Sequence, residues 1–366
     1  MTSTAARSRH HTTQSRERAW GRLGVSPGAR IAALAVADPD TSYSQAEVLS
    51  RLGLAGDEFA ERIFARCGVK RRHLNLSQDF LDRTLQGRSA EVEDALLQHA
   101  IGAIDRLEID PLTIGTLVSS SLYSLGCPAL ANRLADHYGM DPTTDKYHLT
   151  GVGCASAVPL LRLAAQSLQQ HPHKHALVVA AESMSSILMP AAPEDSRAKT
   201  VGSAIFGDGC AAALLSGDAT ASGPLIVATQ VHQLPGTLGA VELAVEPQDS
   251  HLHLERDLPD LASAGLQGLV REFLRHRHLD AGAIDHWIVH PGGRRIIECV
   301  RDALELSDDQ LSASWRALAD HGNVGTPSIF YVLRDTILEH NPGPGERGLV
   351  VTIGPGVTVG LMLLRW

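Results

Sequence analysis

The chain has 366 residues, of which 44% are hydrophobic and 20% charged, and its formal net charge is −9 at pH 7. This length and composition are typical of a globular protein that buries one large core or two fused ones. The acidic charge balance argues against nucleic acid as the main partner, and no apolar run reaches the length of a membrane-spanning helix.

The cysteines and the N-terminal residues indicate the compartment. The five cysteines are widely spaced, odd in number and free of any Cys-x-x-Cys pair. This pattern favours reduced thiols over disulfides or a zinc site, so we expect a cytoplasmic protein. Residues 1–20 are polar and lack the apolar segment of a secretory signal. We expect them to form a disordered tail.

Strands and helices alternate along the first half of the chain, which indicates an α/β protein. Two histidine-containing or basic runs interrupt this pattern. Val69-Lys70-Arg71-Arg72-His73 is a basic cluster after a helix, and either a solvated helix end or a phosphate site fits it. His171-Pro172-His173-Lys174-His175 has no carboxylate or cysteine ligands nearby, so we interpret it as a polar loop and expect no metal site. The expected strands are 32–36, 116–121, 147–149 and 176–181, and the expected helices are 44–52, 58–67, 90–107, 129–138 and 158–168.

A faint internal repeat divides the chain into two halves. A glycine-rich turn followed by an apolar strand occurs at 205–215 and again at 353–364. This repeat predicts two αβ units, 21–217 and 218–366, joined near residues 216–223. In the second half we expect helices at 261–273, 294–304 and 328–338 and a strand at 286–289.

The segment Gly151-Val152-Gly153-Cys154-Ala155 lies between a strand and a helix. Pro159 is tolerated only near the first helical turn, so the helix should begin around Ala155. Cys154 then sits at a helix N-terminus, where the dipole and free N–H groups favour the nucleophilic thiolate. On its own, a small buried structural cysteine explains this context better.

Two distant segments favour a chemical role for Cys154. His290 stands at the carboxyl end of the strand 286–289, where ligand sites of α/β sheets cluster. Asn323 lies in the glycine-flanked segment 320–327, which we interpret as a loop. A histidine can act as base and hydrogen-bond donor, and an asparagine amide donates without titrating. These are the groups that an acylated thiol needs, although their spacing alone does not prove that they converge.

Five sequence motifs resemble segments of a known protein family. Gly-Val-Gly-Cys154-Ala, Val-His290-Pro-Gly-Gly and Gly-Asn323-Val, in this order, resemble the catalytic segments of type III polyketide synthases, the chalcone-synthase-like branch of the thiolase superfamily. Phe206-Gly-Asp-Gly and Gly354-Pro355-Gly356 resemble two further family segments. The similarity runs from about residue 30 to the C-terminus. It implies a pseudo-duplicated αβαβα five-layer sandwich, a homodimer, and no cofactor besides coenzyme A (CoA) thioesters as substrates.

The resemblance also implies a mechanism. Cys154, paired with His290, would take a starter from an acyl-CoA, and malonyl-CoA would lose carbon dioxide to give an enolate stabilised by His290 and Asn323. Phe206 matches the aromatic residue that screens the family's site from water. Arg66 and Lys70 match family positions that contact the phosphates of CoA. Arg295 follows the His290 turn, and a place at the tunnel mouth or on a solvated helix face fits it equally.

Departures from the family pattern concern the cavity. Met184 and Ile187 align with cavity-wall positions, whereas Leu252 stands where the family has an aromatic residue. Ile353 also replaces an aromatic residue, directly before Gly354. Loss of aromatic bulk predicts a larger or differently shaped cavity. This favours a long or branched aliphatic starter and products of the alkylpyrone or alkylresorcinol type.

Two other functions compete with iterative polyketide synthesis. A ketoacyl synthase III-like enzyme that does not iterate, or a thiolase-fold acyltransferase, would use the same fold, although the His-Pro-Gly-Gly segment departs from the His-Gln-Ala-Asn usual in ketoacyl synthase III. An inactive partner subunit would only dimerise with a true synthase. The intact Cys154, His290 and Asn323 disfavour it.

Overall fold

The computed structural model describes residues 24–25, 28–124, 126–192 and 196–366. The predicted tail at 1–20 lies outside these residues. The strands are β1 (Gly24–Val25), β2 (Arg30–Ala37), β3 (Ser42–Ser44), β4 (Arg71–His73), β5 (Ile114–Ser120), β6 (Asp145–Leu149), β7 (His175–Glu182), β8 (Gly209–Ser216), β9 (Leu225–Gln233), β10 (Val241–Val245), β11 (Ser250–Leu254), β12 (His286–Val289), β13 (Arg347–Gly354) and β14 (Thr358–Arg365). The α-helices are α2 (Gln45–Arg51), α3 (Glu58–Arg66), α4 (Gln78–Leu81), α5 (Leu85–Asp105), α6 (Leu130–His137), α7 (Ala157–Ser167), α8 (Arg197–Ile205), α9 (Leu258–Arg275), α10 (Arg294–Ala303), α11 (Ser312–His321) and α12 (Ser328–His340).

The sheet consists of two halves with the same local topology. Its strand order is β12-β13-β14-β9-β2-β8-β7-β5-β6, and Arg30 of β2 pairs with Leu225 of β9 where the halves meet. In one half β8 runs antiparallel to β2 and β7, while β7, β5 and β6 run parallel. In the other, β14 runs antiparallel to β9 and β13, while β12 and β13 run parallel. Strands β8 and β14 therefore occupy equivalent places, and both belong to the internal repeat seen in the sequence.

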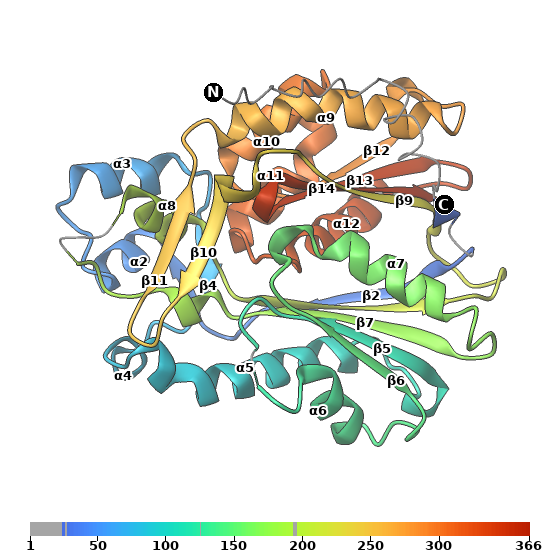
Figure 1. Cartoon of the computed structure of the whole chain (residues 1–366), viewed down its shortest axis with the longest axis horizontal. Helices are drawn as coiled ribbons and strands as arrows, with labels where there is room; N and C mark the ends of the chain where they lie inside the picture. The colour runs from blue at the N-terminus through green and yellow to red at the C-terminus, as the bar shows by residue number, and fades with distance from the viewer. Residues whose placement is uncertain (1–23, 26–27, 125, 193–195) are drawn as a thin grey trace, which may run out of the picture.

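Helices cover both faces of each half-sheet. Figure 1 shows α7 and α12 between the two halves, α5 and α6 on the outer face of the first, and α9 and α10 on the outer face of the second. Every residue of β5 is buried, which explains its unbroken run of apolar and small side chains. This is the five-layer αβαβα sandwich of the thiolase fold, so the predicted fold class is confirmed.

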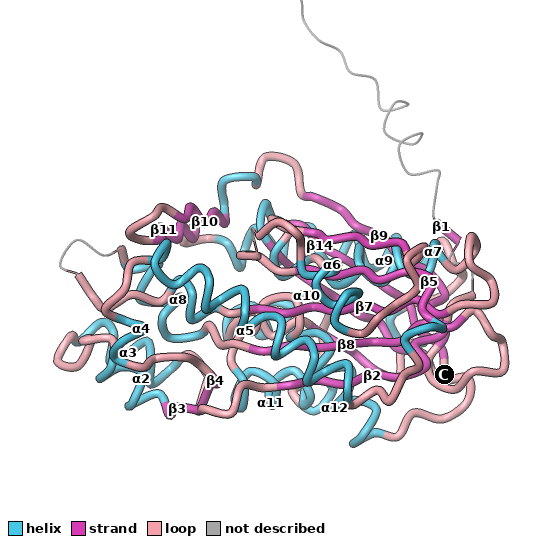
Figure 2. Tube along the Cα trace, turned by 90° about the horizontal axis from the view of Figure 1, so that it is seen from below, coloured by secondary structure: helices cyan, strands magenta, loops and turns pink. Residues whose placement is uncertain are grey.

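A smaller lobe lies beyond one end of the layers. Both views show α2, α3, α8 and the pairs β3–β4 and β10–β11 gathered there (Figures 1 and 2). A buried cluster that includes Val48, Phe64, Leu74 and Ala204 holds much of it together. Residues from this lobe and from the two half-sheets meet at the candidate site described below.

Several elements of the lobe and the second half were absent from the sequence-based prediction. They include α8, α11, β9 and the β10–β11 hairpin. Helix α8 contains Gly202, and α11 is short and begins with serines, so intrinsic propensity gives both a weak signal that tertiary packing overrides. Because α11 continues to His321, the loop predicted at 320–327 begins only at Gly322. No helix in the described part of the chain combines the length and apolarity needed to cross a membrane.

Candidate active site

The turn that carries Cys154 packs against a second glycine-containing turn. Cys154 lies in the 3₁₀ turn Gly153–Ala155, directly before α7, as the sequence predicted for a helix start. A Cβ at Gly354 would lie 2.5 Å from the backbone nitrogen of Ala155, and a Cβ at Gly153 would lie 3.0 Å from the ring of Pro355. Only glycine fits at Gly354, and Gly153 has a φ of +60°, so the two turns form one tight support beneath the thiol.

Gly356 completes the second turn. Its φ is +64°, and a Cβ there would lie 2.9 Å from Nε2 of Gln233. The carbonyl of Gly356 accepts a hydrogen bond of 2.8 Å from the hydroxyl of Thr237. The predicted segment Gly354-Pro355-Gly356 thus lies behind Cys154 as structural support.

Asn323 connects the Cys154 turn with the turn after His290. The Sγ of Cys154 donates to Oδ1 of Asn323 at 3.8 Å. Nδ2 of Asn323 donates to the carbonyl oxygen of Gly292 at 3.2 Å, and its Oδ1 also accepts from the backbone N–H of Gly325 at 2.9 Å. Three segments that are far apart in the sequence therefore converge around one amide side chain.

His290 follows β12 and is 2% exposed. Its backbone N–H donates to the carbonyl oxygen of Val351 at 2.9 Å, which extends the pairing with β13. Both ring nitrogens are buried and have no hydrogen-bond partner among the described residues. The structure therefore contains the three hydrogen bonds of the Asn323 side chain but none between the imidazole of His290 and the Cys154 thiol.

Burial keeps both Cys154 and His290 uncharged. Burial raises the pKa of the Cys154 thiol to about 12, and the nearby Glu182 adds to this shift, while the hydrogen bond to Asn323 opposes it. Burial lowers the pKa of His290 to about 4. The thiolate expected from the helix N-terminus is therefore disfavoured at neutral pH even though Cys154 is only half-buried, because desolvation outweighs the helix dipole and no cation among the described residues pairs with the sulfur.

Two buried residues near Cys154 were missed by the sequence analysis. Glu182 ends β7, and its Oε2 accepts from the backbone N–H of Leu122 at 2.8 Å; burial raises its pKa to about 8. The hydroxyl of Tyr123 is buried without a hydrogen-bond partner among the described residues. Burial raises the pKa of Tyr123, as do Glu182 and Cys154. A carboxylate closing an otherwise buried apolar strand was the one sequence signal for Glu182.

Two of the residues predicted to form the gate and cavity wall, Phe206 and Leu252, lie close together. Phe206 directly follows α8 and forms an isolated parallel β-bridge with Asn323. A Cβ at Gly202 would lie 2.8 Å from Cδ2 of Leu252 and 3.1 Å from Cε2 of Phe206, so both side chains pack on that glycine. Leu252 is 9% exposed and lies on β11.

Met184 and Ile187 belong to the short 3₁₀ helix Met184–Ile187 after β7. The Cε atom of Met184 lies 2.8 Å from the position of a Cβ at Gly325, directly after the Asn323 turn. The carbonyl of Ile187 accepts a hydrogen bond of 3.0 Å from the hydroxyl of Ser250, which is two residues before Leu252. Both residues therefore lie near other predicted site residues.

The predicted CoA-binding residues are all exposed. Arg66 ends α3, Lys70 lies four residues further on, and Arg295 lies in the first turn of α10. A Cβ at Gly68 would lie 3.7 Å from Cβ of Arg294, so the end of α3 lies beside the start of α10. The segments that carry these three exposed cations therefore lie next to each other.

Arg72 departs from the basic cluster predicted at 69–73. It is fully buried, and its guanidinium donates to the carbonyl oxygens of Ser203 at 2.7 Å and Phe206 at 2.8 Å. Burial lowers its pKa to about 9, which still leaves it charged at neutral pH. Arg72 therefore supports the Phe206 segment and is neither a solvated helix end nor a phosphate ligand.

The five-layer sandwich, with a cysteine at the start of a central helix, defines a protein of the thiolase fold. A family model described as "FAE1/Type III polyketide synthase-like protein" matches residues 37–230, and one described as "Chalcone and stilbene synthases, C-terminal domain" matches residues 225–366. The chain belongs to the type III polyketide synthases, which are acyltransferases, and the predicted family and enzyme class are confirmed.

Individual relatives agree with this assignment. The chain is 32% identical over 358 residues to 1,3,6,8-tetrahydroxynaphthalene synthase of Streptomyces peucetius subsp. caesius, covering 93% of this chain and 94% of the relative. It is 27% identical over 359 residues to 3,5-dihydroxyphenylacetyl-CoA synthase of Amycolatopsis orientalis, covering 94% and 95%. The crystal structure of PKS-I from the brown alga Ectocarpus siliculosus superposes with a TM-score of 0.85 at 26% identity, covering 94% of this chain and 99% of that one.

Proposed function

We propose that this type III polyketide synthase carries its starter and its growing chain on Cys154, with His290 and Asn323 as the other two catalytic groups. The observation that carries the proposal is the convergence at Asn323. Its amide contacts the Cys154 thiol through Oδ1 and the carbonyl of Gly292, two residues after His290, through Nδ2. The partnerless ring nitrogens of His290 leave it free to bind a substrate or accept a proton.

The first step loads the starter. Because both groups are neutral, His290 acts as a general base: its ring nitrogen takes the Cys154 proton as sulfur attacks the thioester carbonyl of an acyl-CoA. The carbon–sulfur bond to CoA breaks, the CoA thiolate takes that proton, and the acyl group remains on Cys154. The low exposure of His290 favours this route, since a buried imidazolium without a counterion is costly until the thiolate forms beside it.

The second step extends the chain. Malonyl-CoA loses carbon dioxide, and the electron pair of the broken bond forms an enolate whose oxygen accepts hydrogen bonds from His290 and from Nδ2 of Asn323. The enolate carbon attacks the acyl thioester on Cys154, and the thiolate leaves. The extended chain is now a CoA thioester, and it returns to Cys154 for the next round.

The departures from the family pattern support an aliphatic starter. Leu252 packs beside Phe206 on Gly202, where it presents an aliphatic side chain and no ring. Ile353, which is 7% exposed, directly precedes Gly354 beneath the Cys154 turn. We therefore propose a long or branched acyl-CoA as starter. The names of the two relatives above indicate polyhydroxylated aromatic products, which supports repeated extension and ring closure.

An assay with defined starters tests this function. The purified enzyme is incubated with malonyl-CoA and each of a panel of acyl-CoA starters, or with malonyl-CoA alone, and products are identified by mass. Products containing one starter and at least two malonyl-derived units are expected. Products with a single extension would favour a non-iterating condensing enzyme. Product formation with malonyl-CoA alone, and no incorporation of any starter, would contradict the aliphatic starter.

The exposed cations at the α3–α10 surface are proposed to bind the CoA phosphates. Charge reversal, Arg66→Glu or Lys70→Glu, should raise KM for CoA thioesters and leave kcat nearly unchanged, because the lost contact is equal in the ground and transition states. Small thioesters that lack the nucleotide should be affected far less. Arg271→Glu, exposed on α9, serves as the control and should leave KM unchanged. Equal losses with both substrate types would indicate a structural role.

The sheet edge supports a homodimer. Strand β6 ends the strand order, and its Tyr147 is 40% exposed. A second copy against this edge would satisfy its unpaired backbone groups. A mass in solution of one chain would contradict this proposal.

The five cysteines are free thiols, which suits the reducing cytoplasm that we propose as the compartment of this protein.

A further inference from the structure

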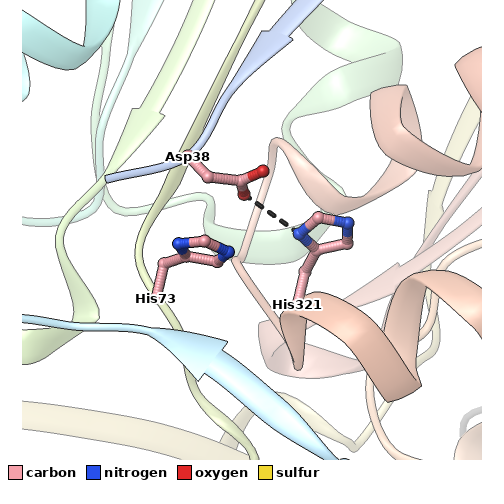
Figure 3. Close-up of side chains that lie close together, drawn as sticks. All are labelled: Asp38, His73 and His321. Atoms are coloured by element: carbon pink, nitrogen blue, oxygen red, sulfur yellow. Dashed lines mark hydrogen bonds and ion pairs between the residues drawn. The ribbon is translucent and has the colours of Figure 1, made fainter. Parts of the chain in front are cut away.

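A cluster of Asp38, His73 and His321 lies outside the proposed active site. Asp38 follows β2, His73 ends β4, and His321 ends α11, so the three residues join the first half-sheet, the small lobe and the segment leading to Asn323. One ligand-capable atom from each lies within 4.8 Å of the others. Figure 3 shows the Asp38 carboxylate, a ring nitrogen of His73 and a ring nitrogen of His321 facing one common space.

We propose that these three side chains form a binding site for a divalent transition-metal ion of the zinc type. Two imidazoles and one carboxylate are a common protein ligand set for Zn²⁺, with the fourth position left to water or another ligand. Ligand atoms about 2.0–2.2 Å from a tetrahedral ion are roughly 3.3 Å apart. The 3.0 Å between Nδ1 of His321 and Oδ1 of Asp38 approaches this spacing, and the ion would replace the proton of the hydrogen bond that joins them. The ligand atom of His73 lies within 4.8 Å of both.

Hydrogen bonds outside the cluster orient the ligands. Nδ1 of His73 lies 2.6 Å from the carbonyl oxygen of Pro39, so it carries the proton and leaves Nε2 with the lone pair that a metal requires. The hydroxyl of Tyr331 lies 2.9 Å from Oδ1 of Asp38 and donates to it. Metal sites typically have supporting contacts of this kind, in which a histidine donates to a backbone carbonyl and a carboxylate accepts from a hydroxyl.

The rings and charges around the cluster also suit a cation. The rings of His73 and His321 are stacked with centroids 6.0 Å apart, and His321 packs at 4.6 Å on the ring of Tyr331, which limits their rotation. The cluster offers one negative charge and two imidazoles that bind metal when uncharged.

Metal binding would act on the turn that holds Asn323. His321 is separated from Asn323 by Gly322 alone, whose φ is +72° and whose Cβ position would lie 2.4 Å from the carbonyl oxygen of Ile205. Because the backbone of this turn is tightly packed, the positions of His321 and Asn323 are closely linked. A metal ion that fixes His321 to β2 and β4 would therefore also stabilise the Asn323 turn. The proposal stands independently of the roles proposed for Cys154 and His290.

Direct binding measurements test the site. Metal-free full-length protein is titrated with Zn²⁺ in competition with a chromophoric chelator, and separately with Co²⁺, whose visible bands report the ligand type. We expect one ion bound per chain at this site, with Co²⁺ bands of nitrogen and oxygen ligation. Strong near-ultraviolet charge-transfer bands would reveal cysteine ligation elsewhere and would overturn the proposal.

Conservative variants locate the ion. Loss of a contact that only supports a metal ligand weakens binding about 10–100-fold. Removing a ligand itself should weaken Zn²⁺ binding by more than this in each of His73→Gln, His321→Gln and Asp38→Asn. His173→Gln, in the exposed histidine-containing run, should bind as the wild type does. Unchanged binding in the three variants, or lost binding in His173→Gln, would contradict the assignment.

Thermal unfolding provides a second readout. Zn²⁺ should raise the Tm of the wild type and of His173→Gln but leave that of folded His73→Gln and Asp38→Asn unchanged, since only a site present in the native state stabilises it. If no ion binds and the variants merely lower the metal-free Tm, the cluster is a hydrogen-bond network and the proposal fails.

Discussion

Cys154 and His290 are both uncharged in the free enzyme at neutral pH, because burial raises the pKa of the thiol to about 12 and lowers that of the imidazole to about 4, opposite to what an ion pair needs. At pH values well below the pKa of such a thiol, only a small fraction of the cysteine is thiolate, and this fraction rises about tenfold for each unit by which the pH increases. The rate of Cys154 alkylation by iodoacetamide should therefore rise about tenfold per unit from pH 6 to 9. Intact-protein mass measures the rate of alkylation, and peptide mapping shows that Cys154 is the modified cysteine.

The variant His290→Ala is the matched control for the alkylation measurement. It should leave the alkylation rate of the free enzyme nearly unchanged and still abolish acylation by acyl-CoA, because the imidazole acts as a base only when substrate is bound. An alkylation rate that stays flat between pH 6 and 9 and falls in His290→Ala would instead demonstrate a pre-formed thiolate–imidazolium pair.

At the level of structural elements, the support beneath Cys154 depends on Gly354. A Cβ there would lie 2.5 Å from the backbone nitrogen of Ala155, which cannot move without displacing the cysteine turn. Gly354→Ala should cost about 1–3 kcal/mol of stability by overpacking and should strongly reduce acyl loading. Gly268→Ala, in α9 with nothing within 4 Å of its Cβ position, is the control and should be neutral or slightly stabilising. Unfolding curves and loading assays compare them, and normal loading by Gly354→Ala would contradict the supporting role.

The β10–β11 hairpin carries Leu252 to the Phe206 segment. Leu252→Phe should shorten the accepted starter or reduce the number of extensions, because the ring would occupy space beside Phe206. Small starters should be affected least. Since Leu252 is only 9% exposed and packs on Gly202, some loss of stability by overpacking is expected as well. Product masses over the starter panel, together with Tm, provide the measurement. Unchanged chain-length preference with a lower Tm would show that Leu252 is core alone.

For the whole molecule, much of the fold was predictable because its core obeys simple periodicity. The strands 176–181 and 286–289 and the helix at 158–168 appear within one or two residues of β7, β12 and α7. The repeat at 205–215 and 353–364 also marked two strands of equivalent topology. Elements of the small lobe and α11 were harder, since glycine and serine weaken their local signal and tertiary packing stabilises them.

The sequence predicted which segments make up the candidate site but not the electrostatics there. Motif resemblance identified Cys154, His290 and Asn323, and the structure brings their segments together around Asn323. Pairing across the fold decides the rest: the burial of Arg72, the carboxyl of Glu182 beside Cys154, and the Asp38 cluster depend on residues that are distant in the chain. Local sequence carries no information on such desolvation.

Acyl transfer to Cys154, monitored by intact-protein mass, tests the central claim most directly. After brief incubation with a medium-chain acyl-CoA, the wild type and Cys67→Ala should each gain one acyl group, and Cys154→Ala should gain none. Asn323→Ala should still load, yet release carbon dioxide from malonyl-CoA about 10²–10³-fold more slowly, since one oxyanion donor is lost. An acyl group on another cysteine in Cys154→Ala, or failure of Asn323→Ala to load while it decarboxylates normally, would contradict the account.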